Sequence, residues 1–245
     1  MSEADWSALV EAAGRDPLVA GLVLTGGRGK GVWTDRSDWD GLLLVADDAV
    51  SRWQAALLVA LDISLLSTSE FTTYAEPGTA FAWRGYDLAH LHAAVDHLPS
   101  GGFQAALDRK GRLDMDVARR IVEGSVGAAL NHLYRAAKST RDGDMRSARW
   151  DLSEMVPVWL AAMFALESRH RPYNKLLAWE LGHHPLRSAE TSSDEVLAAI
   201  DMVISGDITA AWRLEAWLTA GCRSAEITQS LDGWVGHLAE VTPKS

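Results

Sequence analysis

Hydrophobic and polar positions follow two different patterns in the first part of the chain, helical spacing and short apolar runs. Residues 3–13 carry apolar side chains at helical spacing, and residues 50–61 also have a helical pattern, so we expect a helix in each. Residues 18–25 and 38–46 are short apolar runs bounded by glycine or charge, which is typical of buried strands. Between these runs, residues 26–36 are too rich in glycine and charge for a regular element.

Two shorter segments further along are expected to pair as strands. Residues 79–83 and 86–92 flank Arg84 and Gly85, and this dipeptide predicts a tight turn between them. After the glycine pair at 101–102 the pattern changes to long stretches with helical spacing.

The second part of the chain is predicted to be entirely helical. Four helices are expected there, at residues 114–141, 145–170, 193–205 and 208–222. The Asp-Gly-Asp sequence at 142–144 predicts a compact turn, and a short turn favours an antiparallel helix pair. The predicted fold class is therefore α+β, with a small mixed-sheet domain at 1–110 and an all-α helical bundle domain at 111–245.

The composition is that of a globular protein. Of the 245 residues, 48% are hydrophobic and 23% are charged, which is enough apolar material for one large domain or two small ones. No apolar run approaches the roughly 20 residues of a membrane span, so we expect no membrane partner. The opening residues lack the pattern of a secretory signal, and the lone Cys222 cannot form an internal disulfide. These features together favour a cytoplasmic protein.

The net charge is −10 and the isoelectric point is about 5.2. An acidic surface repels phosphate backbones, so we expect no DNA partner. The same charge can steer in a cationic small molecule, although it also serves simply to keep a protein in solution. A monomer and a homodimer both remain open.

Two carboxylates stand at the beginning of the second apolar run. Asp38 and Asp40 are two residues apart, and strand geometry points both side chains to the same face. Carboxylates held so close repel one another unless a cation lies between them. Mg²⁺ prefers hard oxygen ligands from one or two carboxylates and substrate phosphates, so the pair indicates a magnesium site. Alternatively, a short acidic pair of this kind lies on a solvated turn.

A glycine-rich segment precedes the acid pair. The sequence Gly26-Gly-Arg-Gly-Lys-Gly31 follows directly on the first apolar run. Glycines let backbone N–H groups turn toward an anion and let a phosphate approach closely, while Arg28 and Lys30 add positive charge. Alternatively the segment is a flexible turn, but the succession of strand, glycine loop and acidic strand is far rarer than either piece alone.

This succession resembles the DNA polymerase β-type nucleotidyltransferase superfamily. That family has a Gly-Ser pair after its first strand and then, at a fixed distance, Ser-Asp-x-Asp leading into an apolar strand. Here Gly26 and Asp38 keep the distance, Ser37 precedes the acids, and Gly27 replaces the family's serine. The resemblance implies that Gly26, Gly27, Arg28 and Ser37 contact ATP or another nucleoside triphosphate, and that residues 1–110 form the nucleotidyltransferase domain.

The family also requires a third acid on a neighbouring strand, as a metal ligand or as the base for the incoming hydroxyl. Asp87, in the expected strand at 86–92, is the best match, so the implied metal ligands and catalytic residues are Asp38, Asp40 and Asp87. Glu70 and Glu76 are alternatives. Asp87 can also be read as merely ending a hairpin turn, and the nearby His90 and His92 as structural residues.

The helical half resembles that of antibiotic-modifying nucleotidyltransferases, such as the kanamycin and streptomycin enzymes, over residues 131–175. Tyr134 and Lys138 are four residues apart and so share a helical face. The resemblance implies that Lys138 binds the triphosphate and that Lys175 contacts a phosphate. Lys175 can equally cap the second long helix. Acids on the two long helices are candidates for holding substrate amines, namely Glu123, Asp151, Glu154 and Glu167.

The favoured hypothesis is a Mg²⁺-dependent enzyme that moves a nucleoside monophosphate, AMP from ATP in the first instance, to a hydroxyl of a small molecule. A cationic acceptor such as an aminoglycoside antibiotic fits the acidic surface. The alternative is an antitoxin or regulator with the same fold that modifies or masks a partner protein. A purely structural helical protein would leave the glycine loop and the acid pair unexplained.

Overall fold

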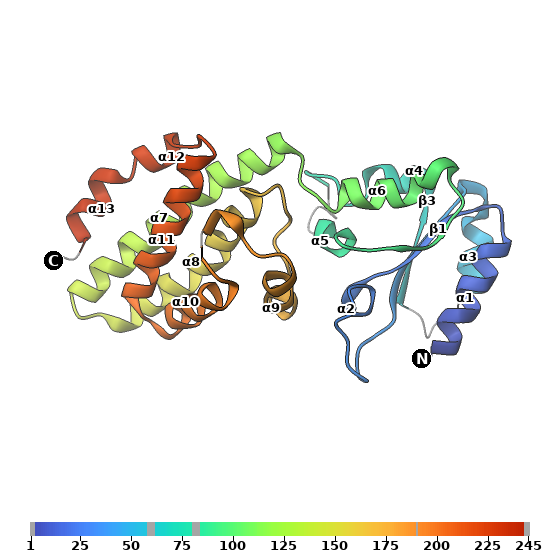
Figure 1. Ribbon diagram of the computed structural model, residues 1–245, viewed down its shortest axis with the longest axis horizontal. Coiled ribbons are helices and arrows are strands. Elements are labelled where there is room, and N and C mark those ends of the chain that lie inside the picture. The colour runs from blue at the N-terminus through green and yellow to red at the C-terminus, as the bar shows by residue number, and fades with distance from the viewer. Residues whose placement is uncertain (1–2, 58–61, 80–83, 190, 243–245) are drawn as a thin grey trace. The chain divides into compact units, whose positions relative to one another are not determined.

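The computed structural model describes residues 3–57, 62–79, 84–189 and 191–242. The chain divides into two compact units, Met1–Arg112 and Leu113–Ser245, called here the sheet unit and the helical unit (Figure 1). Within the described residues, no helix is long and apolar enough to cross a membrane. A small mixed sheet followed by helices confirms the predicted α+β class.

The sheet has four strands in the order β3-β2-β1-β4. Their bounds are Val19–Leu24 for β1, Asp40–Val45 for β2, Asp62–Ser67 for β3 and Ala93–Asp96 for β4. Strand β1 pairs antiparallel with both β2 and β4, whereas β2 and β3 run parallel. The two predicted strands, β1 and β2, are the central ones, and their almost continuous burial explains why both read as apolar runs.

Helices cover both faces of this sheet. On one face Leu43 and Val45 pack with residues of α1 (Glu3–Arg15) and α3 (Val50–Ala56). On the other face Leu42 and Leu44 form a core with residues of three further helices. These are α4 (Thr68–Thr73), α5 (Gly85–Leu88) and α6 (Gly102–Lys110). By strand alternation Asp40 belongs to this second face.

The helical unit is built on two long helices, α7 (Met115–Arg141) and α8 (Met145–Ala165), which confirms the predicted pair and its short turn (Figure 1). Asp114 and Asp144 cap their first turns. Helices α10 (Ser193–Ser205) and α11 (Ile208–Ser224) are also confirmed and pack on the same core. The remaining helices were not predicted: α9 (Asn174–His183), α12 (Gln229–Asp232) and α13 (Val235–Val241).

The sheet unit differs from the sequence predictions in three places. The strand predicted at residues 86–92 is wrong, because residues 85–88 form the short helix α5 and the strand begins only at Ala93. Strand β3 was not predicted at all. The segment 26–36 includes one regular turn, the helix α2 (Gly26–Gly29). Most of the expected strand at 79–83, and residues 58–61 of the expected helix at 50–61, lie outside the described residues.

Candidate functional site

Strand pairing brings the glycine turn and the acid pair together. The first residue after β1, Thr25, donates its backbone N–H to the carbonyl of Asp40 at 2.8 Å. The next residue, Gly26, has φ +60°, and a Cβ built on it would lie 2.5 Å from Oδ2 of Asp40. Only glycine accepts this backbone conformation and this close approach together. The carboxylate of Asp40 therefore lies directly against the turn.

Three backbone N–H groups at the start of α2 have no acceptor in the part of the chain that the structure describes. Among the described residues, no hydrogen bond is formed by the N–H groups of Gly26, Gly27 or Arg28, whereas the N–H of Gly29 bonds to the carbonyl of Thr25 at 2.9 Å. Amides at the start of a helical turn commonly have no partner within the helix, and such groups suit an anionic ligand. A phosphate oxygen could therefore be bound beside Asp40.

The structure explains why Gly27 stands where the family has serine. The backbone N–H of Val32 donates to the carbonyl of Gly27 at 2.7 Å and closes the loop. A Cβ at position 27 would overlap with the carbonyl oxygen of Val32. Because that oxygen belongs to the backbone, it cannot move aside cheaply. A serine at this position is therefore incompatible with the loop as it is folded here.

Arg28 supports the loop. Its Nε atom donates to the carbonyls of Ser37 and Asp38, at 3.1 Å each, and its Nη2 atom donates to Ser37 at 3.0 Å. The guanidinium also lies over the rings of Trp33 and Trp39. The hydroxyl of Ser37 accepts the backbone N–H of Thr34 at 2.9 Å, so it too has a local role. The predicted ligand contacts of Arg28 and Ser37 remain predictions beside these observed ones.

Asp38 and Asp40 differ in their surroundings. Strand β2 begins at Asp40, which is partly buried, and Asp38 precedes it on an exposed segment. Two carboxylate groups of this kind supply the hard oxygen ligands that Mg²⁺ takes from proteins, with substrate phosphates completing the shell. Within the described residues, however, no group of three or more His, Cys, Asp or Glu side chains is placed to hold a metal. Among the residues that the structure describes, a third protein ligand is thus not assembled beside the pair.

Asp87 lies on helix α5 and not on a strand. Its segment is held by Lys30, a residue far away in the sequence. The ammonium of Lys30, which is buried at the end of the glycine turn, donates to the carbonyls of Ala89 at 2.6 Å and Asp87 at 3.3 Å. Burial raises the pKa of the nearby Tyr74 hydroxyl; Arg84 opposes this shift, and the Asp87 carboxylate adds to it. Helix α5 packs through Leu88 on the face of the sheet that carries Leu42 and Leu44, which by strand alternation is also the face of Asp40.

Strand β3 brings in an acid that the sequence interpretation missed. Asp62 is paired in register with Asp40 on the parallel neighbour β2, and side chains at matched positions point to the same face. Like charges directly opposite are unfavourable unless something compensates them. A signal was present: β2 and β3 both begin with aspartate and continue into apolar residues, Asp40-Gly-Leu-Leu-Leu-Val and Asp62-Ile-Ser-Leu-Leu-Ser.

The other candidates for a third acid have structural roles. Glu70 and Ser67 form a capping box at the start of α4, with both hydrogen bonds near 3 Å. Glu76 forms an ion pair with the buried ammonium of Lys110. His90 lies in a turn with φ +62°, so the predicted strand that placed it beside Asp87 is wrong here too.

In the helical unit, Tyr134 and Lys138 share a face of α7 as predicted, with the Lys138 ammonium 5.2 Å from the ring centre. Lys138 is exposed, and its contact with a triphosphate remains a prediction. Lys175 is exposed in the first turn of α9. Because α8 already ends at Ala165, Lys175 does not cap the second long helix, and that alternative is wrong.

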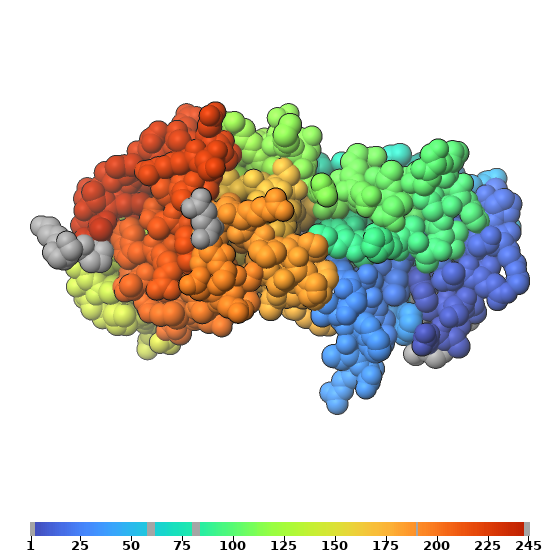
Figure 2. Space-filling model, viewed as in Figure 1, coloured from blue at the N-terminus to red at the C-terminus, as the bar shows by residue number. Residues whose placement is uncertain are grey.

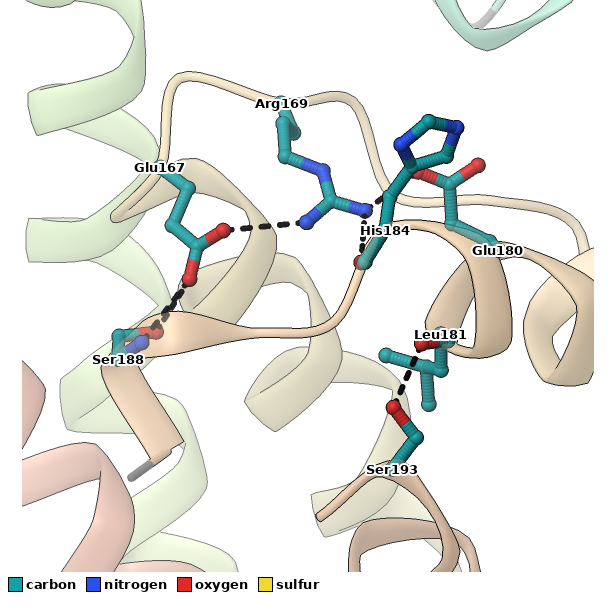
Figure 3. Close-up of polar contacts among 7 residues, drawn as sticks. All are labelled: Glu167, Arg169, Glu180, Leu181, His184, Ser188 and Ser193. Atoms are coloured by element: carbon teal, nitrogen blue, oxygen red, sulfur yellow. Dashed lines mark hydrogen bonds and ion pairs between the residues drawn. The ribbon is translucent and has the colours of Figure 1, made fainter. Parts of the chain in front are cut away.

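Arg169 organises the segment that follows α8 (Figure 3). Its guanidinium forms ion pairs with Glu167 and with the buried Glu180, and it donates to the carbonyl of His184 at 2.8 Å. The other oxygen of Glu167 accepts the backbone N–H and the hydroxyl of Ser188, at 3.0 and 3.1 Å. Both carboxylate oxygens of Glu167, a candidate for binding substrate amines, are therefore already bonded to residues of the helical unit.

Asp151, another of these acids, is likewise engaged. It is buried on α8 and lies 3.1 Å from the Arg135 guanidinium and 3.4 Å from the His132 ring on α7. Glu123 is paired with Arg119 at 2.9 Å on the surface of α7, and Glu154 is exposed. Of the four acids, the two that are least exposed thus tie parts of the helical unit together.

Comparison with known proteins finds a similarity to solved structures only. No protein family model matches the chain, and no curated protein matches it. A search of solved structures finds a nucleotidyltransferase-like protein from Exiguobacterium sibiricum 255-15, with 13% sequence identity and a TM-score of 0.40. That match covers 98% of this chain and 78% of the other. At this identity and score the similarity does not establish a shared fold or activity, so a function must be argued from the residues of the site.

Proposed function

We propose that the chain is a Mg²⁺-dependent nucleotidyltransferase that transfers a nucleoside monophosphate, AMP from ATP in the first instance, to a hydroxyl of a small molecule. The observation that carries this proposal is the close approach of the Asp40 carboxylate to Gly26, beside backbone amides that have no acceptor among the described residues. A site of this kind pairs metal-binding oxygens with phosphate-binding donors. Both are needed to hold a metal–triphosphate complex.

Asp38 and Asp40 would hold the metal. Bound there, Mg²⁺ would align the triphosphate and stabilise the charge on the attacking and leaving oxygens. The amides of Gly26 and Gly27 would donate to phosphate oxygens, with no serine hydroxyl contributing. Lys138 and Lys175 remain proposed phosphate contacts from the helical unit.

The reaction also needs a proton acceptor for the attacking hydroxyl. As that oxygen bonds to the α-phosphorus, the bond from phosphorus to the leaving pyrophosphate breaks, and the hydroxyl proton passes to a carboxylate. Asp87 remains our candidate from the sequence. Asp62 is a second candidate, because the register of β3 places it beside Asp40 on the same face of the sheet.

The acceptor class is proposed from charge. The chain carries 33 acidic against 23 basic residues, which favours a cationic acceptor such as an aminoglycoside-type antibiotic. The alternative is a nucleotidyltransferase-fold antitoxin or regulator that modifies or masks a partner protein. The structure offers no specific feature in favour of that alternative.

A transfer assay tests the proposal. The protein is incubated with Mg²⁺ and ATP or GTP labelled at the α-phosphate, and with a panel of aminoglycosides, lincosamides and candidate partner proteins. We expect label on a small molecule, lost without Mg²⁺ and lost in Asp40→Asn but retained in Asp201→Asn, which changes an exposed acid of α10. Label on a protein would favour the alternative, and label that persists in Asp40→Asn would exclude the proposed site.

A further inference from the structure

Trp33 is unusually exposed for a tryptophan, with 55% of its surface accessible. It belongs to the segment between α2 and β2, which projects from the body of the sheet unit (Figure 2). A single exposed aromatic residue is common on protein surfaces and needs no explanation by itself. The surroundings of Trp33 nevertheless set it apart.

Trp33 is the outer end of a stack of flat groups. The Arg28 guanidinium lies 4.8 Å from the centre of the Trp33 ring and 4.4 Å from that of Trp39. Trp39 in turn stacks on Trp6 of α1, with ring centres 6.1 Å apart and an interplanar angle of 28°. The hydrogen bonds of Arg28 to the carbonyls of Ser37 and Asp38 fix the guanidinium in this stack. One side of Trp33 is thus supported while more than half of its surface stays accessible.

The stack lies next to the glycine turn. The backbone N–H of Val32, the residue before Trp33, donates to the carbonyl of Gly27. Arg28, whose guanidinium Trp33 covers, belongs to the glycine turn and donates to the carbonyl of Asp38, so the ring is held beside the turn and the acid pair. Hydrogen bonds between Thr34 and Ser37 close the other end of the loop. A ring held in this way loses little conformational entropy when a ligand stacks on it.

We propose that Trp33 is a stacking platform for the nucleobase of the donor nucleotide, held in position by Arg28. This inference rests on the proposed function, since it assigns the base of the same nucleotide whose phosphates the glycine turn would bind. Stacking on an indole tolerates different bases because every base has a π-face. ATP and GTP are therefore expected to bind alike, and both more tightly than UTP, because a purine presents the larger ring system.

A pair of ligands separates stacking from phosphate binding. Calorimetry with Mg²⁺ measures the affinity of each variant for ATP and for inorganic tripolyphosphate, which has no base. Trp33→Ala is expected to weaken ATP binding by about tenfold, the usual size of a stacking contribution, while tripolyphosphate changes by less than about twofold. Trp33→Phe keeps an aromatic ring and should retain most of the ATP affinity. Trp150→Ala is the matched control, because Trp150 is 63% exposed on α8.

The outcomes distinguish this inference from the proposed function. If Trp33→Ala leaves ATP binding unchanged, or weakens ATP and tripolyphosphate equally, stacking is wrong while phosphate binding stands. If Trp33→Leu, which keeps an apolar side chain without a ring, binds ATP as well as Trp33→Phe does, stacking is also wrong. If the wild type binds neither ligand in the presence of Mg²⁺, the proposed function and this inference fail together.

Discussion

Two groups of carboxylates, one in each unit, have different surroundings. In the helical unit Asp151, Glu167 and Glu180 are bound by cations of the same unit, and their contacts tie helices and loops together. In the sheet unit Asp40 lies against a glycine turn whose amides have no acceptor among the described residues, and Asp38 stands exposed before it. An acid that is paired with a cation of its own unit has a structural role, because removing that cation is costly. Acids that lie beside N–H groups with no acceptor among the described residues suit a metal–phosphate ligand.

The largest expected effect separates the two candidates for the third acid in the sheet unit. If Asp87 accepts the proton, Asp87→Asn should lower the transfer rate by about 100-fold or more, and Asp62→Asn should have a far smaller effect. The reverse order would assign the role to Asp62. Both substitutions are nearly isosteric, so thermal unfolding should remain close to that of the wild type. Full activity in both variants would contradict a carboxylate base on this face of the sheet.

In the helical unit, removing the cation that pairs with a buried acid should lower the free energy of unfolding. Removing the Arg169 side chain leaves Glu180, which is 1% exposed, without its cation. Arg169→Ala should therefore lower the free energy of unfolding by about 3–5 kcal/mol, measured in urea. The matched control is Arg119→Ala, which breaks the exposed pair with Glu123 and should cost less than about 1 kcal/mol. Equal costs would contradict the distinction between buried and exposed pairs.

A smaller effect is expected at Gly27. Introducing the family's serine there forces Cβ against the carbonyl of Val32, so Gly27→Ser should destabilise the sheet unit by about 1–3 kcal/mol and lower any transfer activity. Gly14 in α1 has nothing within 4 Å of its Cβ position. Gly14→Ala should be neutral or stabilising, since it lies at the end of an exposed helical turn. A more active Gly27→Ser would show that the loop opens more easily than its hydrogen bond suggests.

The smallest expected effect concerns the reactivity of the Cys222 thiol in the helical unit and its dependence on pH. Burial raises the pKa of the Cys222 thiol to about 11, so little thiolate forms in the folded protein near pH 8. This folded-state pKa lies above the unfolded value, so the unfolded chain loses its proton first and stability falls as the pH rises above about 8.5. Iodoacetamide should therefore label native Cys222 slowly and the Arg169→Ala variant faster. Rapid labelling of the native protein would contradict the burial.

Much of the helical unit was predictable because local signals agree with the packing. The helix at 193–205 was predicted with its observed bounds, since apolar periodicity coincides with the capping box of Ser192 and Glu195 and with the left-handed Gly206. By contrast, α9 begins shortly after Pro172 at a site with no side-chain cap, and Lys175 in its first turn gives no favourable dipole signal.

The sheet unit was less predictable because distant contacts decide its local structure. Residues 86–92 have a strand-like pattern, yet Lys30 binds the carbonyls of Asp87 and Ala89 from more than fifty positions away, and α5 forms. Strand β3 alternates weakly, with serines at 64 and 67, and depends on pairing with β2. Gly26 and Asp40 lie close together because the pairing of β1 with β2 brings the end of one strand beside the start of the other.

Binding of ATP in the presence and absence of Mg²⁺ tests the central claim most directly, because it needs no knowledge of the acceptor. Calorimetry should show ATP binding to the wild type and to the control Asp201→Asn with Mg²⁺, and weak binding to both without it. Asp40→Asn should lose the dependence on Mg²⁺ while unfolding at nearly the wild-type temperature. If Asp40→Asn binds Mg²⁺ and ATP as the wild type does, the acid pair beside the glycine turn is not a metal–nucleotide site.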